Sequence, residues 1–77
     1  MELNKYQDLS GGAGVTGYKV VSKGIILQFR HKELYLYDYS IPGKHHIERM
    51  KILAAKGKGL TTYVNQNIRA NYKEKLN

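Results

Sequence analysis

The stretch ELYLYDY, residues 33–39, constrains the fold of this chain more than any other segment. Three of the seven tyrosines lie here at alternate positions, and leucines fill two of the intervening places. Because successive side chains of a β-strand point to opposite faces, a strand would place the three rings on one face and both leucines on the other. Its pairing with a neighbouring strand therefore decides which set enters the core.

The remaining sequence predicts a small α+β domain built on a three-stranded antiparallel meander. We expect strands over residues 18–22, 25–30 and 34–39, where β-branched and aromatic residues are frequent. Residues 44–56 follow Pro42-Gly43 and predict one main helix, whose apolar side chains recur at i, i+3, i+6 and i+7: Ile47, Met50, Leu53 and Ala54.

Two glycines, Gly57 and Gly59, are expected to end this helix. The segment after them is expected to pack back onto the sheet or the helix with Ile68 buried, and its members are Asn65, Ile68, Arg69 and Tyr72.

Two registers are possible for the hairpin formed by residues 25–30 and 34–39. A two-residue turn at His31-Lys32 would place Phe29 opposite Leu34 and would build an aliphatic core face. A three-residue turn would instead join the tyrosines to Leu27 and Phe29 and expose the leucines. We favour the two-residue turn because it pairs aliphatic side chains and sets Arg30 against Glu33.

The length of 77 residues is sufficient for one domain. The glycine-rich stretch at residues 10–14 predicts a flexible N-terminal segment, residues 1–14, followed by a single domain at residues 15–77. The chain has no cysteine, no apolar leader and no long apolar run. We therefore expect a soluble cytoplasmic protein without a membrane partner.

The basic residues are concentrated in the second half of the chain. Residues 1–38 carry five basic and four acidic side chains, whereas residues 39–77 carry eight and two. A strongly basic half on a small domain favours a polyanionic partner, of which nucleic acid is the most common.

Motifs for catalysis or cofactor binding are weak. Residues 12–17 match G-x-G-x-x-G, but they precede a strand instead of a helix, so a glycine-rich turn is the better interpretation. Adjacent His45 and His46 would point about 100° apart on a helix and are expected to be surface residues. The serines show no arrangement with His and an acid. We expect no enzyme, no cofactor and no metal site.

The tyrosines and the basic residues form the one constellation that indicates a function. Nucleic-acid bases stack on aromatic rings, while phosphates contact Lys and Arg. The residues predicted to bind nucleic acid are Tyr35, Tyr37, Tyr39, Arg30, Lys32, Arg69 and Lys73. The opposing interpretation is that tyrosine, a favoured strand residue, contributes its ring to the core.

The order of these segments resembles the KTSC domain family, named for its presence at the C-terminus of some lysyl-tRNA synthetases. Residues 25–30 match the first family strand, residues 35–37 the Y-x-Y motif, and Ile41-Pro42 the V-P step. Residues 47–55 match the helix and residues 63–72 the closing segment. The resemblance spans residues 15–73 and implies the same α+β fold, with RNA as the associated partner.

This chain departs from the family in its turn, where Lys32 replaces the usual glycine. We expect a non-catalytic RNA-binding module; the alternative is a protein-interaction or dimerisation module that uses the tyrosine face. Basic residues on the same face as the tyrosines would favour nucleic acid.

Overall fold

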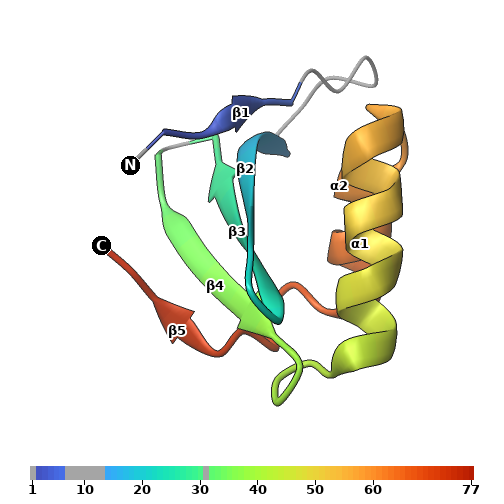
Figure 1. Ribbon diagram of the computed structural model, residues 1–77. Coiled ribbons are helices and arrows are strands. Elements are labelled where there is room, and N and C mark those ends of the chain that lie inside the picture. Colours follow the sequence, from blue (N-terminus) through green and yellow to red (C-terminus); the bar gives the residue numbers. More distant parts are fainter. Residues whose placement is uncertain (1, 7–13, 31) are drawn as a thin grey trace.

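The computed structural model describes residues 2–6, 14–30 and 32–77. Along the chain the elements are β1 (Asn4–Lys5), β2 (Val15–Val21), β3 (Gly24–Phe29), β4 (Leu34–Asp38), α1 (Lys44–Lys56), α2 (Leu60–Asn67) and β5 (Glu74–Lys75). The five strands form one antiparallel sheet in the order β1-β2-β3-β4-β5, and both helices stand on the same side of it (Figure 1). The predicted α+β class is confirmed, and the predicted three-stranded meander is the centre of a wider sheet.

The hairpin of β3 and β4 adopts the register that we did not favour. Ile25 lies opposite Tyr37 and Leu27 lies opposite Tyr35. The tyrosines thus share the helix-covered face with the apolar residues of β3, and Tyr37 has no exposed surface. The expected aliphatic core face that included Leu34 and Leu36 was wrong, since Tyr37 is more buried than either leucine.

Lys32 explains how this register forms. The backbone N–H of Phe29 donates to the carbonyl oxygen of Glu33 (2.9 Å), so three residues connect the paired strands. Lys32 has a φ of 66° and its N–H donates to the carbonyl oxygen of Phe29 (2.8 Å). A left-handed residue at the end of a three-residue connection is a common hairpin geometry. The expected turn at His31-Lys32 fails on this pairing, and His31 itself lies outside the described residues.

Helix α1 has the bounds that the sequence predicts. Ile47, Met50 and Ala54 are buried against the sheet, and the predicted end at Gly57 is confirmed by its left-handed conformation (φ 72°). The N–H of Gly57 donates to the carbonyl oxygens of Leu53 and Ala54 (3.0 and 3.1 Å). A glycine accepts this conformation without strain, so it ends the helix and allows the chain to turn into α2.

The closing segment belongs to the core. Leu60 and Val64 of α2 have no exposed surface, and Ile68 after the helix is 3 % exposed. The prediction of a buried Ile68 is confirmed. Asn65 is exposed, and its side chain contacts Arg69 in place of the sheet.

The described part of the N-terminal segment pairs with the sheet. Asn4 and Lys5 pair with Tyr18 and Gly17 of β2, and Tyr6 is 4 % exposed. The backbone N–H of Leu60 donates to the Tyr6 hydroxyl (3.0 Å). Residues 4–6, which the sequence assigns to a flexible segment over residues 1–14, thus contact the sheet and α2, while residues 7–13 lie outside the described part.

Two isoleucines test whether the closing segment carries core stability. Ile68→Ala should lower the free energy of unfolding by about 2–5 kcal/mol because it opens a cavity in the core. Ile52→Ala, at a helix position that is 52 % exposed, is the matched control and should change it by less than about 0.5 kcal/mol. Urea denaturation measures both; equal losses would contradict the assigned core.

The strain at Lys32 gives a prediction of the opposite sign. Lys32→Gly should raise the free energy of unfolding by about 1 kcal/mol, because glycine adopts the left-handed region freely. Lys19→Gly, within strand β2, should lower it by about 0.5–1 kcal/mol. Denaturation of both variants provides the check, and a destabilised Lys32→Gly variant would count against the three-residue connection.

Candidate nucleic-acid interface

The tyrosines of β4 and Tyr39, which follows the strand, face the helix side of the sheet but are exposed to different degrees. Tyr37, at the centre, is fully buried, whereas Tyr35 and Tyr39 on either side are half-buried. The difference arises because Tyr37 lies over the centre of the core, and its neighbours lie toward the margin.

Tyr37 is held as a structural residue. Its hydroxyl donates to the carbonyl oxygen of Arg69 (3.0 Å), and its ring meets that of Tyr72 edge-to-face with centroids 6.4 Å apart. Burial removes water from the phenol and raises its pKa well above the ordinary tyrosine value. Tyr37 thus joins β4 to the closing segment and offers no surface for a ligand.

Tyr35 belongs to an aromatic cluster that reaches the surface. Its ring centroid lies 5.5 Å from that of Phe29 and 4.6 Å from that of Tyr72. Tyr72 is 37 % exposed, so the outer part of the cluster faces solvent. The Arg69 guanidinium carbon lies 4.6 Å from the Phe29 ring centroid, within the range of a cation–π contact.

Arg69 is positioned by a second contact as well. One of its guanidinium N–H groups donates to the side-chain oxygen of Asn65 (2.9 Å). The guanidinium has five N–H donors in total, and its side chain is exposed. Donors remain available for an anion next to the Tyr35–Tyr72 ring pair.

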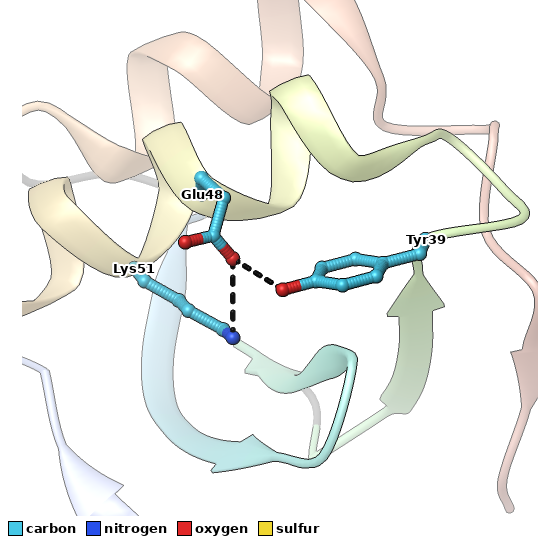
Figure 2. A network of polar contacts seen from close by, with 3 residues as sticks. All are labelled: Tyr39, Glu48 and Lys51. Atoms are coloured by element: carbon cyan, nitrogen blue, oxygen red, sulfur yellow. Dashed lines mark hydrogen bonds and ion pairs between the residues drawn. The ribbon is translucent and has the colours of Figure 1, made fainter.

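Tyr39 forms a separate polar network with helix α1, shown in Figure 2. Its hydroxyl donates to a carboxylate oxygen of Glu48 (2.7 Å), and the same oxygen lies 3.3 Å from the Lys51 Nζ. The hydrogen bond from Tyr39 is the main cause that lowers the pKa of Glu48, and the same bond raises the pKa of Tyr39. The Nζ atoms of Lys44 and Lys51 lie 5.7 and 5.6 Å from the Tyr39 ring centroid. Helix lysines and this tyrosine therefore share one side of the molecule.

The remaining predicted residues surround the cluster less closely. Arg30 and Lys32 are exposed at the connection between β3 and β4. Lys73 donates its backbone N–H to the carbonyl oxygen of Leu36 (2.7 Å), which places it beside the outer edge of β4. An acidic group is also present, since the Tyr35 hydroxyl donates to Glu33 (3.4 Å).

Four residues of this surface were not among those predicted to bind nucleic acid, and they are Tyr72, Lys75, Lys44 and Lys51. Tyr72 was expected only to pack, and the Tyr35 ring that it joins comes from a strand far away in sequence. Lys75 lies opposite Tyr35 in β5, a two-residue strand that carries no periodic signal. Lys44 and Lys51 were not singled out among the basic residues of the helix. Their spacing of seven residues, or two helical turns, places them on one face and could have identified them.

The described residues provide no group of three His, Cys, Asp or Glu side chains that could hold a metal ion. His46, one of the adjacent histidines, makes a 2.6 Å contact between its Nδ1 and the Tyr63 hydroxyl. Within residues 2–6, 14–30 and 32–77, no helix has the length and apolar character needed to cross a membrane.

Comparison with known proteins gives no relative for this chain. No family model, no curated protein and no solved structure matches it.

The buried phenol of Tyr37 predicts a specific response to pH. Because its folded-state pKa is raised, its contribution to stability is complete below the unfolded pKa of about 10 and is lost as pH rises beyond that value. Tyr37→Phe should lower the free energy of unfolding by about 1 kcal/mol at neutral pH, through the lost hydrogen bond to Arg69.

From about pH 9.5 to pH 11 the free energy of unfolding should fall faster for the wild-type chain than for Tyr37→Phe. The difference in free energy of unfolding between the two chains should therefore narrow as the pH rises. Urea denaturation across this range measures it. A difference that stays constant would show that Tyr37 is not held neutral by burial.

Proposed function

We propose that this chain is a non-catalytic module that binds single-stranded RNA on the helix side of its sheet. The observation that carries the proposal is the position of Arg69, which lies on the Phe29 ring beside the Tyr35–Tyr72 pair, whose outer ring, Tyr72, is exposed. A ring for stacking and a cation for phosphate stand next to each other, which is the combination that single-stranded nucleic acid requires.

Each residue has a role in this proposal. Tyr72, supported from below by Tyr35, offers the stacking surface, and Arg69 contacts the adjacent phosphate. Tyr37 supports the site through its bond to the Arg69 carbonyl and takes no base. The outer cations extend the path of the backbone, and they are Arg30, Lys32, Lys73 and Lys75.

Tyr39 forms a second position along the same side of the sheet. Its ring is flanked by Lys44 and Lys51, although Glu48 holds its hydroxyl. A base on the exposed part of this ring would have two ammonium groups within reach of its phosphates.

We also propose that the chain belongs with the KTSC domains. What supports this is the order of elements: a hairpin carrying Y-x-Y, an Ile-Pro step, a helix, and a closing segment whose Ile68 and Tyr72 return to the sheet. Lys32 occupies the left-handed position (φ 66°), where the family pattern has glycine.

Salt titration separates the roles of charge and stacking. Binding of labelled poly-U RNA, followed by fluorescence anisotropy, should weaken as salt rises, with a log-log slope of about −0.7 per phosphate neutralised. Replacing Arg69 and Lys73 together with Ala should make this slope shallower. Tyr72→Leu should keep the slope and weaken binding by about 1–3 kcal/mol.

The matched control is Tyr63→Leu, since that ring packs against His46 instead of the cluster. It should bind RNA as the wild type does. Heparin bound as tightly as RNA, together with a Tyr72→Leu variant that binds normally, would leave only non-specific charge. No RNA binding at low salt would contradict the proposal and favour a protein partner for the same face.

A further inference from the structure

The side of the sheet away from the helices carries a surface of its own, here called the open face. Its side chains alternate with those of the core along the strands, and they include Lys19, Ile26, Leu34, Leu36, Glu74 and Leu76. Figure 1 shows both helices on the opposite side. The two leucines of β4 are half-buried and lie outside the helix-side core cluster.

One row across the open face has an ordered distribution of charge. Lys19 lies opposite Ile26, Ile26 opposite Leu36, and Leu36 opposite Glu74. Across strands β2 to β5, the row therefore consists of a cation, two aliphatic side chains and an anion, in that order. Three strand intervals of about 4.8 Å separate the backbones of the two charged residues by about 14 Å.

Neither charge is neutralised within the chain. In the described residues, the one ion pair is Lys51 with Glu48, on the helix side. The side chains of Lys19 and Glu74 form no hydrogen bond and no ion pair there. Two strands lie between them, and they form no ion pair with each other within one copy.

We propose that the open face binds a second copy of this chain as a twofold symmetric dimer. A twofold axis between Ile26 and Leu36 reverses the row, so Lys19 of one copy meets Glu74 of the other, and the reverse contact forms as well. Between these ion pairs the half-buried leucines of β4, Leu34 and Leu36, supply the apolar contact, while Ile26, which is 8 % exposed, lies beneath it. Such self-complementarity is what an isologous interface requires.

The arrangement also specifies the strength and geometry of the dimer. Five strands span about 20 Å, so the contact is small and belongs to the weak end of protein association. The surface formed by Arg69, Tyr35 and Tyr72 remains outside on both copies, since it lies on the other side of the sheet. This proposal is independent of RNA binding.

Charge reversal with mixing tests the proposal directly. Lys19→Glu and Glu74→Lys should each weaken self-association about tenfold or more, because each places like charges opposite one another at two symmetric contacts. An equimolar mixture of the two variants should form a heterodimer, because both contacts then join a carboxylate of the first variant to an ammonium group of the second. Sedimentation equilibrium at concentrations up to about 1 mM detects each state.

Lys58→Glu is the matched control, since it makes the same charge change in the loop between the helices. It should dimerise as the wild type does, and circular dichroism should show that all variants remain folded. Wild-type association should also weaken with rising salt, which needs no variant. A wild-type chain that stays monomeric at about 1 mM, or variants that fail to restore association on mixing, would overturn the proposal.

Discussion

The pairing of Leu27 with Tyr35 is the constraint on which the two sides of this molecule depend. A strand alternates strictly, so one register places Tyr35 and Tyr37 on the helix side, and a shift by one residue would place the leucines there instead. With the observed register, Tyr37 enters the core and bonds the Arg69 carbonyl. The closing segment is then positioned to bring Tyr72 and the Arg69 guanidinium to the margin of the same core.

Two surfaces of different chemistry result from this one choice. On the helix side, a ring pair and a guanidinium lie together at the margin of the core. On the open face, Ile26 and Leu36 lie between Lys19 and Glu74. The proposed RNA site and the proposed dimer contact therefore occupy opposite sides and do not compete for residues.

The sequence predicted both ends of helix α1 correctly. This was possible because the apolar periodicity and the terminal glycine both lie within one continuous segment. The hairpin register could not be predicted in this way. Judged from the sequence alone, the pair Phe29–Leu34 of one register is as favourable as the pair Leu27–Tyr35 of the other. The deciding feature, Lys32 in the left-handed region, is a conformation that sequence assigns to glycine. Tyr72 was missed as a site residue because its partner, Tyr35, is 37 residues distant in sequence.

Nuclear Overhauser effects between α-protons test the central register most directly. Hydrogen-bonded and non-hydrogen-bonded pairs alternate along an antiparallel hairpin, and the non-hydrogen-bonded pairs have the short Cα separation of about 4.5 Å. Because Phe29 and Glu33 form a hydrogen-bonded pair, the next pair along the strands is of the short kind, as is every second pair after it. Strong α-proton contacts should join Gln28 with Leu34 and Ile26 with Leu36. Contacts joining Phe29 with Leu34 and Leu27 with Leu36 would show the two-residue turn and would contradict the account of both faces.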